Sequence, residues 1–160
     1  MATQDEILAA NERYSSGFEK GDLPMPPGRR LAVVTCMDAR LDPAKFLGLD
    51  EGDAHVIRNA GGLATDDALR SLVISHHLLG TQEAFVIGHT DCGMLTFTDD
   101  ALREQLGPDA AEVDFHSFGD VEGRVRESVA AIRETPLLPD SFGASGFVYD
   151  VRSGRLREVT

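Results

Sequence analysis

Three residues of this chain could bind one soft divalent metal ion. Cys36 follows the apolar segment LAVVT, while His89 and Cys92 belong to one short segment, H-T-D-C. Two thiolates and an imidazole suit zinc far better than magnesium or calcium, which prefer oxygen ligands. A structural zinc site usually takes four ligands from the protein, whereas three leave a position for water, as in catalytic sites. We therefore predict a catalytic zinc ion held by Cys36, His89 and Cys92.

Asp38 and Arg40 lie beside the first predicted ligand, in the segment C-M-D-A-R. An aspartate close to zinc can bind the metal as a fourth ligand, or it can accept a hydrogen bond from hydroxide on the metal. A guanidinium paired with Asp38 would hold the carboxylate ionised and off the metal. The sequence leaves both states of Asp38 open, and we predict Asp38 and Arg40 as catalytic residues.

Strands must position these side chains. Residues 31–35 and 83–88 are short apolar segments rich in β-branched residues, as is typical of strands buried on both faces. Residues 55–62, HVIRNAGG, predict a further strand that ends in a glycine pair. In open α/β sheets, ligands bind at the carboxyl ends of the strands. The predicted strands would therefore bring Cys36 and His89 to the same edge of the sheet.

The remaining pattern alternates helices with strands. We predict helices over 65–79, with Thr65 as the amino-terminal cap and Gly80 as the stop, and over 120–134. Residues 146–159 predict a strand, a Ser-Gly turn and a second short strand. This order favours an α/β fold, with a mostly parallel central sheet flanked by helices.

The first residues predict an arm outside this sheet. Apolar residues in 3–20 fall on one side of a helix that would end near Gly21, and the proline-rich segment that follows predicts an extended connector. The apolar side must be buried on the same domain or on a second subunit. We predict one domain over 1–160, in which residues 1–28 form a helical arm and linker and residues 29–160 form the α/β core.

The composition excludes several classes of function. The 160 residues include 27 acidic and 15 basic side chains, and the net charge of −12 would repel nucleic acids and anionic lipids. No apolar run approaches the roughly 20 residues of a membrane span. The first residues lack the basic-then-apolar order of a signal peptide, and two cysteines would stay reduced in a cytoplasmic chain. We expect a cytoplasmic protein with a small-molecule substrate and no nucleic-acid or membrane partner.

These motifs together resemble the β-class carbonic anhydrases, in particular their small bacterial branch. The family pattern C-x-D-x-R followed by H-x-x-C stands here as Cys36, Asp38, Arg40, His89 and Cys92. The resemblance extends through HVIRNAGG and GHTDCGM to YDVRSGRLREV, and so covers most of residues 30–160. It implies one zinc ion per subunit and a parallel sheet of about four strands with a further edge strand. It also implies a homodimer or a higher homo-oligomer, in which the arm packs across the partner subunit.

The activity implied by the resemblance is reversible hydration of carbon dioxide to bicarbonate by zinc-bound hydroxide. Asp38 would orient the hydroxide through a hydrogen bond, while Arg40 keeps the carboxylate ionised. Carbonyl sulfide and carbon disulfide are alternative substrates, because hydroxide can attack these linear isosteres in the same manner. An alternative from another class is a non-catalytic zinc module, or a redox pair formed by Cys36 and Cys92.

Other residues carry weaker signals. The remaining histidines are expected on the surface or packed in the fold, although one of them could relay the proton; they are His55, His76, His77 and His116. Glycines 61, 62 and 93 are expected either to permit close approach of the backbone around the pocket or to be ordinary turn glycines.

Overall fold

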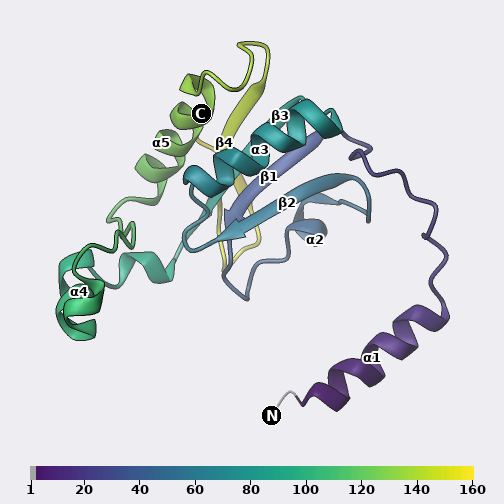
Figure 1. Ribbon diagram of the computed structural model, residues 1–160, viewed down its shortest axis with the longest axis horizontal. Coiled ribbons are helices and arrows are strands. Elements are labelled where there is room, and N and C mark those ends of the chain that lie inside the picture. The colour runs from purple at the N-terminus through teal and green to yellow at the C-terminus, as the bar shows by residue number, and fades with distance from the viewer. Residues whose placement is uncertain (1–2) are drawn as a thin grey trace.

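A five-stranded sheet forms the centre of the computed structural model, which describes residues 3–160 (Figure 1). Its strands are β1 (Leu31–Cys36), β2 (Ala54–Asn59), β3 (Glu83–His89), β4 (Gly143–Tyr149) and β5 (Leu156–Glu158). The strand order is β2-β1-β3-β4-β5; the first four strands are parallel, and β5 pairs antiparallel with β4. The predicted fold class, with about four parallel strands and a further edge strand, is confirmed.

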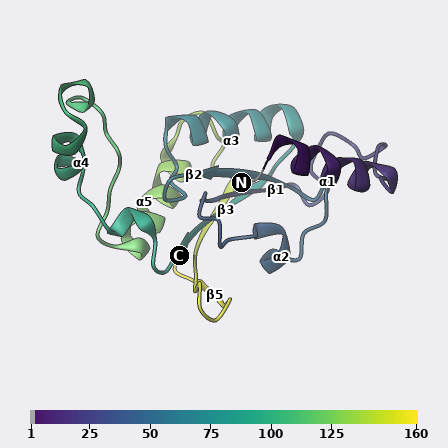
Figure 2. The same cartoon turned by 90° about the horizontal axis from the view of Figure 1, so that it is seen from below.

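Helices cover the two faces of the sheet unequally. They are α1 (Gln4–Ser16), α2 (Pro43–Leu47), α3 (Asp66–Leu79), α4 (Asp99–Leu106) and α5 (Val121–Glu134), with short 3-10 turns η1 (Gly93–Leu95) and η2 (Pro108–Ala110). Figure 2 shows α3 on one side of the sheet and the five-residue α2 on the other. Because side chains alternate across a strand, each face has its own apolar cluster.

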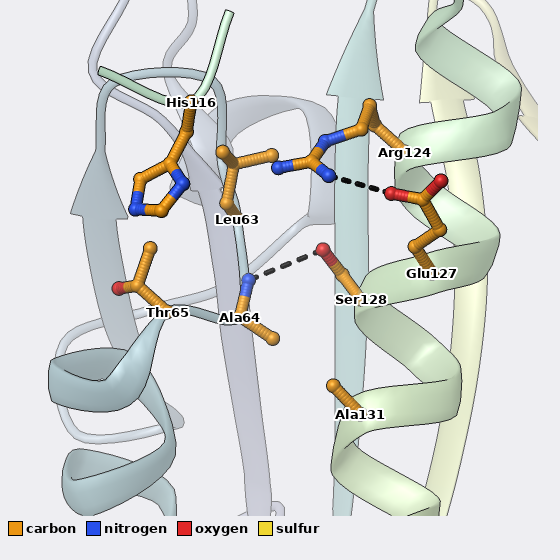
Figure 3. Close-up of a pocket in the computed structure, with 8 residues that line it drawn as sticks. All are labelled: Leu63, Ala64, Thr65, His116, Arg124, Glu127, Ser128 and Ala131. Atoms are coloured by element: carbon orange, nitrogen blue, oxygen red, sulfur yellow. Dashed lines mark hydrogen bonds and ion pairs between the residues drawn. The ribbon is translucent and has the colours of Figure 1, made fainter. Parts of the chain in front are cut away.

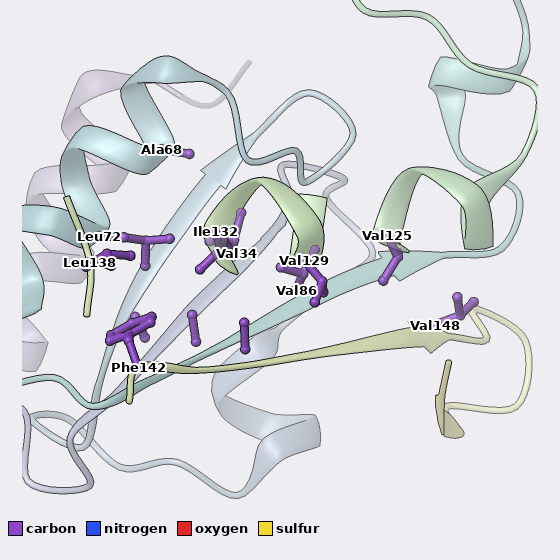
Figure 4. Close-up of a cluster of buried hydrophobic side chains, with 13 residues drawn as sticks. Val34, Ala68, Leu72, Val86, Val125, Val129, Ile132, Leu138, Phe142 and Val148 are labelled. Carbon is purple, nitrogen blue, oxygen red and sulfur yellow. The ribbon is translucent and has the colours of Figure 1, made fainter. Parts of the chain in front are cut away.

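The larger cluster lies under α3 and α5 (Figure 4). It joins alternate strand residues such as Val34 and Val86 to Leu72 of α3 and to Val129 and Ile132 of α5, and all five are almost fully buried. On the opposite face, Leu31, Val33 and Ile87 pack against Phe46 and Leu47 of α2. Strand β1 is buried along its whole length, as its uninterrupted apolar pattern predicts.

Helices α3 and α5 occupy the predicted segments, with differences at their ends. Thr65 is the residue before α3, but its side chain makes no capping hydrogen bond. Strand β2 ends at Asn59 rather than at residue 62, because Gly61 and Gly62 both adopt positive φ angles and turn the chain out of the sheet. Strand β4 begins at Gly143, three residues before the predicted start.

The prediction that the first helix ends near Gly21 was wrong. Helix α1 ends at Ser16, and Gly17 caps it by donating its N–H to the carbonyls of Tyr14 and Ser15. No residue of α1 is buried, so no tertiary contact extends the helix to Phe18. Figures 1 and 2 show α1 beside the body of the chain, on the side opposite α4. Within residues 3–160, no helix has the length and apolar character needed to cross a membrane.

Candidate metal centre

The ends of two neighbouring strands bring the three predicted ligands together. Cys36 is the last residue of β1, His89 is the last residue of β3, and Cys92 lies three residues further along, before η1. Their candidate ligand atoms all lie within 4.8 Å of one another, and all three residues are buried. Among the described residues, this is the one group of histidine, cysteine and acidic side chains whose geometry could hold a metal ion.

The imidazole of His89 is oriented for a ligand. Its Nδ1 lies 2.8 Å from the carbonyl oxygen of Thr90. A carbonyl can only accept, so Nδ1 carries the proton and Nε2 presents its lone pair. Within residues 3–160, Nε2 is buried without a hydrogen-bond partner. Such an orphaned acceptor next to two cysteines is what a metal ligand requires, and a hydrogen bond from the other ring nitrogen to a carbonyl is typical of ligating histidines.

Cys36 and Cys92 are both free cysteines, and a hydrogen bond between them stabilises one thiolate. The neighbouring Cys92 thiol, which can donate a hydrogen bond to a thiolate, lowers the pKa of Cys36 to about 4. The same interaction, together with burial, raises the pKa of Cys92. The pair therefore loses its first proton more easily than an ordinary cysteine does, and metal binding would displace the second proton.

Asp38 faces the group but is held by Arg40. The guanidinium donates from Nε to Oδ1 at 3.0 Å and from Nη2 to Oδ2 at 2.7 Å. These bonds keep the pKa of Asp38 well below its usual range. Oδ2 also lies 3.8 Å from Nε2 of His89. Of the two states that the sequence left open, the structure has the carboxylate on Arg40 and beside the candidate metal position.

Two residues of β2 stabilise the backbone around this site. The sequence did not indicate them as site residues. Arg58 donates to the carbonyls of Cys36, at 2.9 Å, and Asp38, at 2.7 Å. The Asn59 side chain exchanges two 2.8 Å hydrogen bonds with the backbone of Leu63 and closes the turn between them. An arginine and an asparagine at the carboxyl end of a strand, directly after the apolar Val56 and Ile57, were the signal for this role.

The glycine pair permits the approach that the sequence predicted. Gly62 has φ +67°, and a Cβ there would lie 2.7 Å from the backbone nitrogen of Cys36. Gly61 has φ +89°, and a Cβ there would lie 3.0 Å from the Phe118 ring and 3.3 Å from Cγ of Met94. Gly93 differs, because a Cβ there would meet no atom within 4 Å, so the prediction of close approach at this third glycine was wrong.

A cavity of about 200 Å³ opens onto the group. Its wall combines Cys36, Asp38 and Cys92 with apolar atoms of Met37, Ala60, Gly61, Gly93 and Met94. Its exposed wall is almost entirely apolar. The cavity can therefore hold a small apolar molecule next to two thiols and one carboxylate.

A second cavity, of about 210 Å³, lies between the start of α3 and α5 (Figure 3). Arg124 pairs with Glu127 there at 2.6 Å, and Ser128 accepts the N–H of Ala64 at 3.1 Å. His116 lines this cavity and not the first one. The other three histidines make hydrogen bonds within the fold: the part-buried His55 bonds Ser75, the part-buried His76 bonds the Thr81 carbonyl, and the exposed His77 bonds the Leu137 carbonyl.

Comparisons with known proteins agree with the geometry. The family model described as carbonic anhydrase matches residues 31–115. The β-carbonic anhydrase 1 of Mycobacterium tuberculosis is 49% identical over 166 residues, which cover 100% of this chain and 99% of that protein. The chain belongs to the β-class carbonic anhydrase family. It is also similar to a carbon disulfide hydrolase of Acidithiobacillus thiooxidans, at 40% identity over 98% of this chain and 90% of that protein.

The fold of this β-class carbonic anhydrase agrees with a solved structure of the family. The carbonic anhydrase of Streptococcus mutans superposes with a TM-score of 0.93, at 48% identity, over 100% of this chain and 99% of that chain. The similarity therefore includes helix α1 as well as the sheet. Membership in the family also confirms that the chain is an enzyme of the carbonic anhydrase type.

Proposed function

We propose that this chain catalyses the reversible hydration of carbon dioxide to bicarbonate, with one zinc ion held by Cys36, His89 and Cys92. The observation that carries the proposal is the buried Nε2 of His89, which lacks a partner among residues 3–160 and lies next to two free cysteines. A nitrogen and two sulfur donors match zinc in number and softness. The 49% identity with a β-carbonic anhydrase supports the reaction.

Zinc, when bound, supplies Lewis acidity that lowers the pKa of water and makes hydroxide available near neutral pH. The residues of the chain orient the attacking oxygen and hold the substrate. Asp38, ionised because of Arg40, can accept a hydrogen bond from the attacking oxygen and orient its lone pair. The apolar wall at Met37, Ala60 and Met94 accommodates a linear apolar substrate and excludes water from it. One C–O bond forms, and the proton of the water passes to buffer.

A stopped-flow assay of carbon dioxide hydration tests this proposal. Zinc-loaded chain should accelerate the pH change well above the buffer rate, and chain stripped of metal and kept reduced should lose the activity. Readdition of zinc should restore it. Zinc-loaded, folded chain that gives only the buffer rate would contradict the proposal.

Carbon disulfide is the second candidate substrate, since a relative of that activity is 40% identical over most of the chain. Hydroxide can attack its carbon as it attacks carbon dioxide, but the product then contains sulfide. The same zinc-loaded preparation, incubated with carbon disulfide, should release little sulfide compared with the bicarbonate formed from carbon dioxide. Sulfide release that exceeds carbon dioxide turnover would reverse the order of the two substrates.

We also propose that the chain forms a homodimer or a higher homo-oligomer, in which the arm 1–28 covers a partner core 29–160. The support is the apolar side of α1, where Ile7 is 60% exposed and Tyr14 is 56% exposed. Apolar surface of this kind on a separate helix is stabilised by burial against another surface. Light scattering after size exclusion should give a multiple of the chain mass. Ile7→Asp should shift the mass toward one chain, and Glu12→Ala, at an exposed position of the same helix, should not.

A further inference from the structure

We propose that Asp91 is a positioning residue that fixes Arg40 and, through it, keeps Asp38 off the metal. The inference rests on the proposed function, because it concerns the fourth ligand position of the proposed zinc ion. Asp91 lies in the H-T-D-C segment between His89 and Cys92, but it is not one of the predicted ligands. Its side chain is 69% exposed and is directed to Arg40 instead.

Arg40 bridges two loops that are 51 residues apart in sequence. On one side, its Nε and Nη2 donate to the Asp38 carboxylate. On the other side, Nη1 donates to Oδ2 of Asp91 at 2.8 Å, and Nη2 donates to the Asp91 carbonyl at 2.8 Å. The guanidinium is thus held from both sides, and its rigid fork transmits the orientation set by Asp91 to Asp38.

The backbone of Asp91 makes this contact possible. Its φ of +54° lies in the left-handed region, which aspartate and asparagine tolerate better than most residues. The turn directs the Asp91 carbonyl and carboxylate to Arg40, while Cys92, the next residue, and His89, two residues before, belong to the metal group. The H-T-D-C segment, which supplies two of the proposed ligands, therefore also anchors Arg40, the residue that holds Asp38.

Without the Asp91 contact, Arg40 would hold Asp38 less firmly. The Arg40 side chain is 48% exposed, so it can turn to water once Nη1 loses its partner. Asp38 is only 15% exposed, and its Oδ2 already lies 3.8 Å from Nε2 of His89. A carboxylate released by Arg40 would compete for the open metal position. Because exposed ion pairs contribute little, we expect this equilibrium to shift by a factor of about two to five.

The first test needs no metal. In metal-free, reduced chain, the solvent exchange of the Arg40 Nε proton is measured by NMR for wild type, Asp91→Asn and Asp100→Asn. Asparagine tolerates the same backbone and keeps the carbonyl contact, so the substitution removes mainly the charge. Asp100 is the matched control, since it is an exposed aspartate that pairs with Arg103 at 3.1 Å. Exchange should be about two- to fivefold faster in Asp91→Asn only, and unchanged exchange would overturn the proposal.

The second test measures how tightly an added anion binds at the open metal position. Cobalt-substituted chains are titrated with thiocyanate and followed by their visible spectra. Asp91→Asn should bind thiocyanate about two- to fivefold more weakly than wild type and Asp100→Asn, because Asp38 competes for the metal. Equal affinities would overturn the proposal, since Asp91 would then hold Arg40 without affecting Asp38. Wild-type chain that gives no thiocyanate response would also overturn it, because the position would then be closed at rest.

The two tests separate this inference from the proposed function. Failure of zinc-loaded wild type to hydrate carbon dioxide would reject the proposed function, and the exchange rate of Arg40 would still report whether Asp91 anchors it. Asp91→Gly provides the final control, because glycine relieves the positive φ and also lacks the carboxylate. It should behave as Asp91→Asn does; wild-type behaviour of Asp91→Gly would assign the effect to the backbone and overturn the role of the side chain.

Discussion

The segment 60–65 contributes to two cavities of nearly equal size, and only one of them has the features of a metal site. Ala60 and Gly61 line the cavity of about 200 Å³ at the cysteines, whereas Leu63, Ala64 and Thr65 line the cavity of about 210 Å³ against α5. In the second cavity Arg124 pairs with Glu127 through Nη1, and the one lining atom that is buried without a partner among residues 3–160, the Arg124 Nε, is a hydrogen-bond donor that cannot bind a metal. In the first, the His89 Nε2 has no partner among residues 3–160. Volume does not distinguish the two cavities, but unsatisfied ligand atoms do.

Removing one proposed ligand atom should have the largest effect, because it should remove the capacity of the first cavity to bind a metal. Cys92→Ser should weaken zinc binding by more than the roughly 100-fold that loss of an outer hydrogen-bonding partner causes, because it removes a direct ligand. Carbon dioxide hydration should disappear with the metal. Zinc per chain, measured by elemental analysis after dialysis, checks the result. Glu127→Gln, in the second cavity, should keep one zinc ion per chain; equal zinc retention by both variants would refute the ligand assignment.

Asp38→Asn should separate metal binding from catalysis within the first cavity. The carboxylate accepts hydrogen bonds from Arg40 with both of its oxygens. The asparagine amide has only one accepting oxygen, and because this oxygen is uncharged it pairs weakly with Arg40. We expect zinc content to stay at one per chain and kcat for hydration to fall by about 100-fold or more, the scale of a positioned acid or base group. Stopped-flow rates and elemental analysis on the same sample give both values. Activity equal to that of wild type would remove Asp38 from the mechanism.

The close approach of the backbone at the first cavity can be tested through stability. Gly62→Ala would place a Cβ 2.7 Å from the Cys36 nitrogen at a φ of +67°, so the strand end or the turn must move. Left-handed strain and overpacking together should lower the free energy of unfolding by roughly 2–5 kcal/mol. Gly93→Ala is the matched control, because nothing lies within 4 Å of its Cβ. Urea unfolding of the metal-free chains measures both, and equal midpoints would contradict the packing argument.

The strand pattern was enough to predict which residues meet at the metal group. Cys36 and His89 end apolar, β-branched segments, and parallel strands place such ends at one edge. The role of Asp91 was not predictable, because its contact with Arg40 depends on a left-handed φ and on two loops that only the tertiary fold brings together. Helix α4 was missed although Thr98 caps it and Gly107 ends it, the same signals that predicted α3. Helix α4 is only eight residues long and none of its residues is buried, so the segment is shorter than the roughly 11 to 18 residues over which apolar periodicity identifies a helix.

The smallest expected effect lies in the second cavity. Ser128 is 6% exposed, and its hydroxyl accepts the N–H of Ala64 at 3.1 Å. Ser128→Ala removes this acceptor, but water in the adjoining cavity can replace it, so the free energy of unfolding should fall by only about 1 kcal/mol. Ser71→Ala, which removes a hydroxyl from an exposed bond to the Asp67 carbonyl, should cost less. Zinc content and hydration rate should stay at wild-type values in both. A loss of metal in Ser128→Ala would mean that the two cavities are coupled through residues 60–65, and the contrast between them would then have to be abandoned.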